Sequence, residues 1–187
     1  MRVPRPSSSP LVVVRVVGEP KPAGSKVSGV RYRRDLNGTK IPVVKDGRIT
    51  TFTKDTSGLA GVRWRRDVAR AGLQAWRGRE LLAEPLFVDM TFLLDRPRTH
   101  FRSGRFQSVL RDAAPVFPAV RPDVLKLARA VEDALTGVLW QDDALIVGAR
   151  YEKVYAEPGE LAGVEVRVWT AAMPYTGLML CAGGDAG

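Results

Sequence analysis

The chain has 187 residues, of which 29 are Lys or Arg and 20 are Asp or Glu, so its formal net charge is +9. This length suits one domain with a real hydrophobic core, and the positive charge favours a polyanionic partner. The single Cys181 excludes an internal disulfide and fits a reducing, intracellular setting, while the single His100 excludes a histidine-rich zinc site. No apolar run approaches the length of a membrane span.

The chain is predicted to begin with an arm, a strand and a phosphate-contacting loop. Residues 1–10 are rich in Pro and Ser, and we expect them to form a flexible arm before a strand over residues 11–17. A Pro/Gly-rich loop follows over residues 18–29, in which Lys21, Ser25 and Lys26 could contact phosphate. The triplet around Ser25 lacks the spacing of a nucleotide-binding loop, so no nucleotide cofactor is expected.

A hairpin and a helix are predicted next. Asp46-Gly47 marks the turn of a hairpin over residues 41–53. Thr56 or Ser57 can cap a helix that continues to about Trp76. The residues expected on the buried side of this helix are Val62, Ala69, Leu73 and Trp76, with Trp64 also in the core. Its arginines are either phosphate contacts or a solvated surface: Arg63, Arg65, Arg66 and Arg70.

The middle of the chain predicts a long strand followed by a basic loop. Residues 86–94 alternate in the manner of a strand with one buried face. Residues 96–120 form a long loop, and loops of this length in compact domains are usually functional or mobile. Residues 96–129 hold eight Arg or Lys against two Asp, a local charge of +6. Such a strip can supply salt-dependent contacts to phosphate that carry no sequence information.

The segment from Arg121 to Ala144 is the most informative. Pro122 and Gly137 are start and stop signals for a helix over residues 123–136. Its apolar positions recur at the spacing of a face that packs on a sheet: Val124, Leu127, Ala128, Val131, Ala134 and Leu135.

Strands are predicted after this helix. Residues 138–140 are interpreted as a short strand that leads to the pair Asp142-Asp143, and residues 145–155 and 163–170 as further strands. We therefore expect the start of the helix and the end of the short strand to bring Asp123 and Asp143 together. Trp140 is expected in the interior, with stacking on a base as the alternative. Residues 173–187 are expected to form a flexible tail.

One set of residues in this segment forms a recognisable pattern: Pro122, Asp123, Lys126, Leu127, Arg129, Asp133-Ala134-Leu135 and Asp142-Asp143. The pattern is similar to the core of the RusA family of bacterial and phage Holliday-junction resolvases. Weaker similarity extends over residues 11–170, through the loop at residues 18–26, Trp64, the segment 92–104 and Lys153. The resemblance implies a single α/β (α+β) domain over residues 11–172, with a mixed β-sheet and about two main helices packed on it.

The resemblance also implies a metal-dependent nuclease site. A metal ion polarises the phosphodiester and makes bound water nucleophilic, and Mg²⁺ prefers carboxylate oxygens. The implied ligands are Asp123 and Asp143, with Asp142 beside them, for Mg²⁺ or Mn²⁺ in its place. Arg129 is expected to steady the scissile phosphate, with an ion pair to Asp133 as the alternative. The expected DNA contacts are Lys21, Ser25, Lys26, Arg102, Arg105, Arg121, Lys126 and Lys153.

Two positions depart from the family pattern. Leu125 stands where the family's second catalytic Asp is expected, and Leu145 replaces a glutamine common after the Asp pair. Leucine cannot ligate a cation, so metal binding is expected to weaken. Glu132 is a poor substitute, because seven residues of helix place it about 10 Å further along the axis.

Two functions follow from this pattern. The first is a Holliday-junction resolvase that acts as a homodimer and nicks opposed strands of a four-way junction in the cytoplasm of a bacterial or phage-infected cell. The dimer is implied by the family and by the two-fold symmetry of the substrate. The second is a catalytically inactive member that only binds branched DNA, because Leu125 has replaced a ligand. Neither function involves a membrane.

Overall fold

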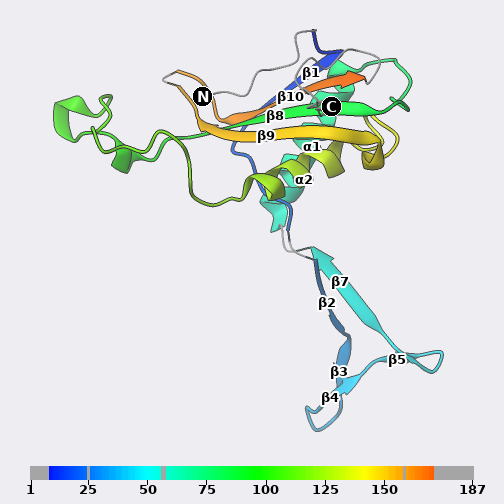
Figure 1. Cartoon of the computed structure of the whole chain (residues 1–187). Helices are drawn as coiled ribbons and strands as arrows, with labels where there is room; N and C mark the ends of the chain where they lie inside the picture. Colours follow the sequence, from blue (N-terminus) through cyan, green and yellow to red (C-terminus); the bar gives the residue numbers. More distant parts are fainter. Residues whose placement is uncertain (1–8, 25, 56–57, 158, 171–187) are drawn as a thin grey trace, which may run out of the picture.

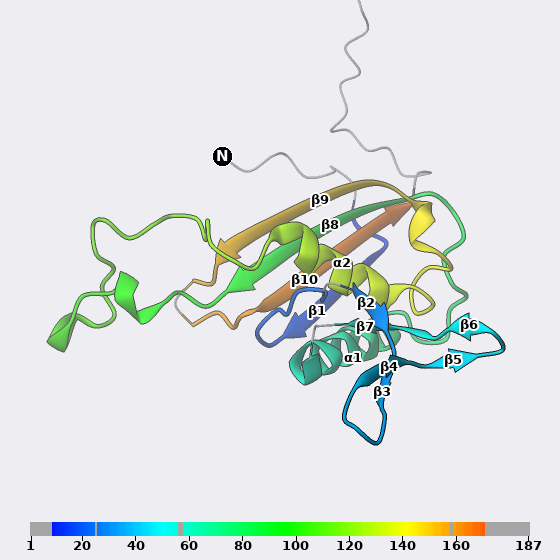
Figure 2. The same cartoon turned by 90° about the horizontal axis from the view of Figure 1, so that it is seen from below.

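The computed structural model describes residues 9–24, 26–55, 58–157 and 159–170, and its main element is a four-stranded mixed sheet. The strands in spatial order are β1 (Val12–Val17), β10 (Gly163–Thr170), β8 (Leu86–Leu94) and β9 (Ile146–Tyr155). Neighbouring strands are antiparallel except β8 and β9, which are parallel. Two helices, α1 (Gly58–Ala75) and α2 (Val124–Leu135), lie on the same side of the sheet (Figures 1 and 2). The predicted mixed sheet with two packed helices is confirmed.

The hydrophobic core fills the space between the sheet and the helices. Alternate residues of β8 are buried, as predicted: Leu86, Val88, Met90 and Phe92. The apolar face of α2 meets them through Leu127, Ala128, Val131 and Leu135, which are all at most 1% exposed. Trp64 and Trp76 are also buried, as expected. Burial of this apolar surface is the main stabilising contribution to the fold.

The helix α2 begins and ends where the sequence predicts. Asp123 is its N-cap residue in an extended conformation, and Thr136 is its C-cap. Gly137 follows with a φ of 75°, a left-handed conformation that glycine adopts without a steric penalty. The chain then returns through η3 (Asp143–Leu145) into β9.

The predicted buried side of α1 is only partly correct, because Trp76 is buried but Val62 and Leu73 are not. Val62 is 44% exposed and Leu73 is 59% exposed, whereas Gly61, Trp64, Val68 and Gly72 are buried. The reason is close packing of the two helices, since a Cβ atom at Gly72 would lie 2.7 Å from a methyl carbon of Leu135. Small residues let the helices approach, so the apolar side chains of the opposite side are left in solvent.

The short strand predicted over residues 138–140 is also wrong. The segment is a turn in which Trp140 makes isolated bridges with Leu82 and Thr136. Trp140 is fully buried, and its indole nitrogen donates to the Thr136 hydroxyl at 3.1 Å. It therefore fills the core, which excludes stacking on a base in this structure.

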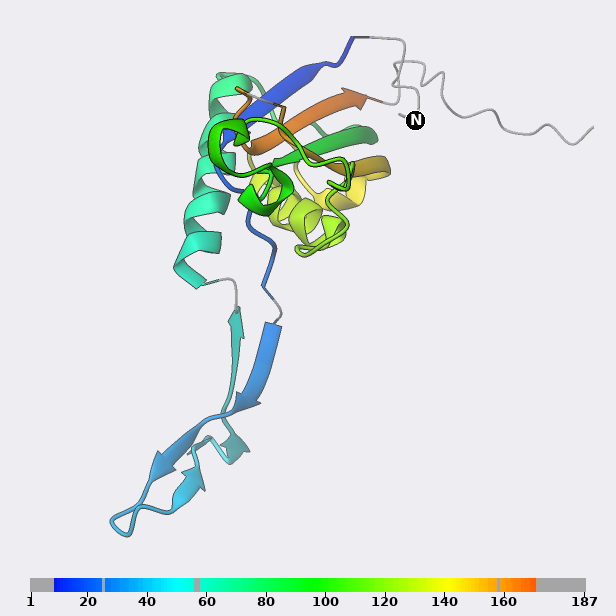
Figure 3. The ribbon, with the colours of Figure 1, turned by 90° about the vertical axis from the view of Figure 1, so that its left-hand side faces the viewer.

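A β-arm projects from the domain between β1 and α1 (Figure 3). Its strands are β2 (Lys26–Val30), β3 (Tyr32–Arg34), β4 (Lys40–Pro42), β5 (Val44–Lys45), β6 (Arg48–Ile49) and β7 (Thr51–Asp55). The predicted turn at Asp46-Gly47 is confirmed, with φ values of 51° and 72°. The predicted loop over residues 18–29 is wrong at its end, because residues 26–30 pair with β7.

The remaining predictions concern loops, caps and termini. The basic loop after β8 contains two short 3-10 helices, η1 (Arg98–His100) and η2 (Gly104–Phe106). The expected caps Thr56 and Ser57, the predicted contact Ser25, most of the N-terminal arm and the C-terminal tail with Cys181 lie outside the described residues. In the described part of the chain, no helix is long and apolar enough to cross a membrane.

Candidate functional site

The start of α2 is held in place by two neighbouring segments. The backbone N–H of Ala23, in the loop after β1, donates to the carbonyl of Lys126 at 2.8 Å. From β9, the Lys153 ammonium donates to the carbonyl of Pro122 at 2.9 Å and also to the carbonyl of Val120. The segment that carries Asp123 is therefore fixed from both sides, and Lys153 is a positioning residue for it.

An open pocket surrounds this helix start. Its lining brings together four of the residues singled out from the sequence: Lys21, Arg121, Asp123 and Lys126. The other lining residues are Glu19, Pro20, Pro22 and Pro122. Three cations outnumber the two carboxylates of this pocket, and together with a helix N-terminus they form a surface suited to a phosphate group.

The Asp123 carboxylate is available to a ligand. It makes no capping hydrogen bond to α2, and its side chain is 62% exposed. Its ion-pair partner is the Lys126 ammonium at 3.7 Å, and an exposed pair of this kind is weak. Lys21 is paired with Glu19 at 2.6 Å. Asp123 can therefore change partners at little free-energy cost.

Leu125 lies in the first turn of α2 and is 67% exposed. It is not part of the hydrophobic core. A polar side chain at this position would therefore not disturb the packing of α2, so stability gives no reason for a leucine here.

The second acidic group lies beyond the other end of α2. Asp142 is the N-cap of η3, and its carboxylate accepts a hydrogen bond from the Ala144 N–H at 2.9 Å. Asp143 is in the first turn of η3, and both aspartates are exposed. Leu145 packs partly against the core, so it is not free to contact a ligand as a surface residue would be.

The expectation that Asp123 and Asp143 meet is wrong for a single chain. Asp123 precedes the helix and Asp143 follows it, and the 12 residues of α2 span about 18 Å. Figure 2 shows α2 running between the arrowhead end of β9 and the loop that begins β9. In the described residues, no group of three or more His, Cys, Asp or Glu side chains could hold a metal ion. The predicted ligand set does not fit a metal within one chain.

Two charged residues of α2 lie between the acidic groups. Arg129 is exposed, and the ion pair with Asp133 considered from the sequence is not formed among the described residues. Glu132 accepts a hydrogen bond from the Tyr151 hydroxyl. Burial, that hydrogen bond and the negative charge of Glu132 raise the pKa of Tyr151 above its ordinary value. Glu132 is thus committed to Tyr151, which agrees with its rejection as a substitute ligand.

The basic loop presents its predicted DNA contacts to solvent. Arg102 pairs with Asp112 at 3.0 Å, and Arg105 lies over the ring of Phe106 with 4.9 Å to the centroid. Both arginines are exposed. Lys26 lies at the start of β2, but its side chain is outside the description.

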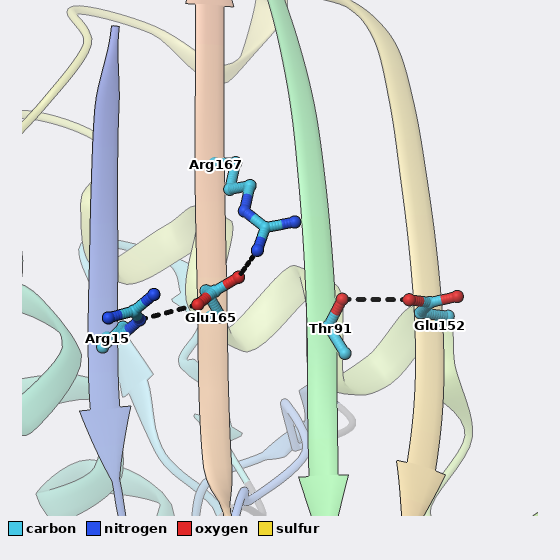
Figure 4. Close-up of polar contacts among 5 residues, drawn as sticks. All are labelled: Arg15, Thr91, Glu152, Glu165 and Arg167. Carbon is cyan, nitrogen blue, oxygen red and sulfur yellow. Dashed lines mark hydrogen bonds and ion pairs between the residues drawn. The ribbon is translucent and has the colours of Figure 1, made fainter. Parts of the chain in front are cut away.

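The face of the sheet opposite the helices has a different electrostatic character. Glu165 pairs with Arg15 at 2.6 Å and also with Arg167, while Thr91 donates to Glu152 at 3.1 Å (Figure 4). These charged side chains are paired with one another, between β1 and β10 and along β10. The helix side therefore offers more exposed positive charge, in the cations around Asp123.

Sequence reasoning missed the exposed cations of the β-arm and the role of Tyr151. The signal for the arm was present, because residues 31–50 contain six Arg or Lys and two Asp. The prediction for this segment rested only on the turn at Asp46-Gly47 and not on the positive charge of the segment. No sequence signal indicates the contact between Tyr151 and Glu132, which joins a helix to a strand.

Comparison with known proteins supports one family. The family model described as endodeoxyribonuclease RusA matches residues 41–169. No curated protein sequence matches the chain at a significant level. The matched range contains α1, β8, α2 and β9, together with the acidic residues at both ends of α2.

Proposed function

Since this chain belongs to the RusA endodeoxyribonuclease family, we propose that it is a metal-dependent Holliday-junction resolvase that nicks opposed strands of four-way DNA junctions in recombination and repair. The observation that supports this function best is the pocket at the start of α2, where Lys21, Arg121 and Lys126 surround the exposed Asp123. The cations can hold a phosphate, and the carboxylate can take part in a metal site. We place this activity inside the cell, as the single cysteine suggests.

We further propose that the metal site is completed by a second copy of the chain. Asp123 and Asp143 lie beyond opposite ends of α2, so a two-fold dimer with antiparallel α2 helices would bring Asp123 of one chain near the partner's Asp143. Two such sites arise in one dimer, as two opposed nicks require. The proposed metal is Mg²⁺, with Mn²⁺ as a substitute, and Asp142 lies next to Asp143.

The exposed side of α2 offers complementary charges for this dimer. Arg129 and Asp133 are one helical turn apart, and neither is paired with the other in the described structure. A two-fold axis level with residue 131 of α2 would bring Arg129 opposite the partner's Asp133, and the reverse pair would form by symmetry. β9 is an edge strand, with Val147 61% exposed, so the dimer can also cover this edge.

A second candidate function is supported by Leu125. This exposed leucine occupies the position expected for a ligand, so the chain could bind branched DNA without cutting it. The two functions share the DNA contacts predicted from the sequence: Lys21, Ser25, Lys26, Arg102, Arg105, Arg121, Lys126 and Lys153. They differ in whether the remaining carboxylates suffice for cleavage.

The deciding experiment measures cleavage of a synthetic four-way junction with Mg²⁺ and then Mn²⁺, beside a gel shift in EDTA. Paired symmetric nicks support the resolvase, and tight binding without nicks supports the binding protein. A chain that neither cuts nor prefers a junction over linear duplex contradicts both.

A variant at Leu125 sharpens this experiment. Leu125→Asp should fold normally, because an exposed side chain at a helix start tolerates a carboxylate. We expect it to raise metal-dependent cleavage on the order of a hundredfold, as restored positioning of the ion implies, with little change in junction affinity. The matched control is Leu161→Asp, since Leu161 is 66% exposed in the loop between β9 and β10. If both variants cut like the parent, Leu125 is not at a ligand position.

A further inference from the structure

The β-arm forms a fork that projects from the domain. We name residues 26–55 the forked arm: the stem is β2 paired with β7, and the two prongs are the β3–β4 and β5–β6 hairpins. Figures 1 and 3 show it extending away from the sheet, beyond the start of α1. The stem contains five residue pairs and spans about 16 Å. The prongs therefore reach well beyond the body of the domain.

A ring of backbone hydrogen bonds fixes the fork point. The N–H of Arg31 donates to Thr50 at 2.8 Å, the N–H of Thr50 donates to Val43 at 2.7 Å, and the N–H of Val43 donates to Arg31 at 2.8 Å. Each segment that meets at the fork both donates and accepts one bond. The two prongs consequently leave the stem in defined directions.

The tips of the prongs are also ordered by local bonds. Asp35 accepts from the N–H groups of Asn37 and Thr39 at 2.9 and 2.8 Å. The other tip is the Asp46-Gly47 turn with both φ values positive, which matches the twist of a two-residue hairpin. The carboxylate of Asp35 thus binds within its own turn and forms no ion pair with a neighbouring cation among the described residues.

The forked arm carries a concentration of exposed positive charge. Its cations beyond the stem are Arg31, Arg33, Arg34, Lys40, Lys45 and Arg48, and all are exposed. They stand against two carboxylates, a net charge of +4 over residues 31–50. None of the six forms an ion pair with a carboxylate among the described residues. This contrasts with the open face of the sheet in Figure 4, where the charges are paired.

The described residues of the forked arm lie outside the hydrophobic core. None of its described residues belongs to the buried cluster, and Leu36 at one tip is fully exposed. Packing in the core therefore does not explain why the arm has an ordered backbone and cations without ion pairs. A projecting two-stranded ribbon with unpaired arginines has the shape and charge to follow the phosphates of a DNA groove.

We propose that the forked arm is a second DNA-binding element, which grips the phosphate backbone of a duplex arm of the substrate away from the pocket around Asp123. This role rests on the proposed function, because a branched substrate offers a duplex arm beyond the point of cleavage. Arginine suits such contacts, since its planar group binds phosphate through two donors. The contacts carry no sequence information and depend strongly on salt.

Two variants test the forked arm. In the first, an Asn-Gly turn replaces residues 32–49, because Arg31 already donates to Thr50 and this pair can close a hairpin. In the second, Arg33, Arg34, Lys45 and Arg48 are changed to Gln. The matched control changes Arg33 and Arg34 to Lys, which keeps the charge. Thermal melting of all variants should match the parent, because the core is untouched.

The measurement is junction affinity in EDTA at several salt concentrations. Each lost phosphate contact should reduce the magnitude of the slope of log K against log salt by about 0.9. The slope of the four-glutamine variant should therefore be smaller in magnitude by up to about 3.6. The shortened arm should behave similarly, and the lysine control should retain most of the slope. Unchanged affinity and slope in both test variants would overturn this role while leaving junction binding and cleavage by the parent intact.

The other outcomes are also distinct. A parent chain that binds no DNA would overturn both the arm's role and the proposed function. If the shortened arm changes the oligomeric state by sedimentation, with no change in salt slope, the arm contacts a second copy of the chain instead of DNA.

Discussion

Replacing Lys153 with Met tests whether this residue positions Asp123 or contacts DNA itself. The ammonium group donates to the carbonyls of Pro122 and Val120 and so ties β9 to the segment before α2. Hydrogen bonds from a charged donor contribute about 1.5–3 kcal/mol each. Both bonds are partly open to water, so we expect Lys153→Met to lower the free energy of unfolding by about 2 kcal/mol. That corresponds to a fall of roughly 4–8 °C in Tm.

The functional effect of Lys153→Met should fall on cleavage. A displacement of about 1 Å at Asp123 costs on the order of a hundredfold in rate, while junction affinity in EDTA should stay close to that of the parent. Single-turnover cleavage is measured in the parent background or, if the parent does not cut, in the Leu125→Asp background. The control is Lys126→Met, which alters the pocket around Asp123 without removing a side-chain bond to the backbone. An unchanged Tm together with a salt slope lower by about 0.9 would refute the positioning role and support a direct phosphate contact.

Two further predictions concern the core that supports the site. Gly72→Val should destabilise the chain by about 1–3 kcal/mol, because even a Cβ would lie 2.7 Å from a methyl carbon of Leu135. Calorimetry should show a lower Tm for this variant. The control Leu73→Ala, at an exposed position of the same helix, should leave the Tm unchanged. Trp140→Ala should cost about 3–5 kcal/mol in chemical denaturation, since the indole is fully buried and bonded to Thr136, with junction affinity per folded molecule unchanged. A Trp140→Ala variant that is as stable as the parent but binds DNA more weakly would instead support the alternative interpretation, in which Trp140 stacks on a base.

Local signals were sufficient for the elements that carry the site. Pro122 and Gly137 mark the two ends of α2 correctly, because the first is compatible with a helix start and the second adopts a positive φ after the helix. The alternation over residues 86–94 likewise identifies β8 and its buried face. These features depend on neighbouring residues in the sequence, so they can be read without knowing the fold.

Features that depend on packing between elements were predicted less well. The buried side of α1 is chosen by glycines that permit contact with α2, which hydrophobicity alone does not reveal. The fork of the arm depends on bonds between Arg31, Val43 and Thr50, which are distant in sequence. The separation of Asp123 from Asp143 could have been inferred, because a helix followed by a short connection to a strand leaves its own start one helix length away.

Mixing two inactive variants tests whether one site uses both chains. Asp123→Asn and Asp143→Asn each remove a proposed ligand, and neither should cut a junction alone. If Asp123 works with the partner's Asp143, a mixed dimer contains one site with both aspartates and one site with neither. A refolded mixture, in which about half of the dimers are mixed, should then nick one strand per junction.

The arrangement in which both ligands come from the same chain predicts a different result. Every site in the mixture would lack one aspartate, so the mixture would be as inactive as its components. Mixing either variant with a chain that carries both substitutions is the control and should give no nicks in either arrangement. The assay uses the parent background or, if the parent does not cut, the Leu125→Asp background. Inactivity of the mixture, with mixed dimers demonstrated by differential tagging, would therefore contradict the shared site. It would require a rearrangement within one chain to bridge the length of α2.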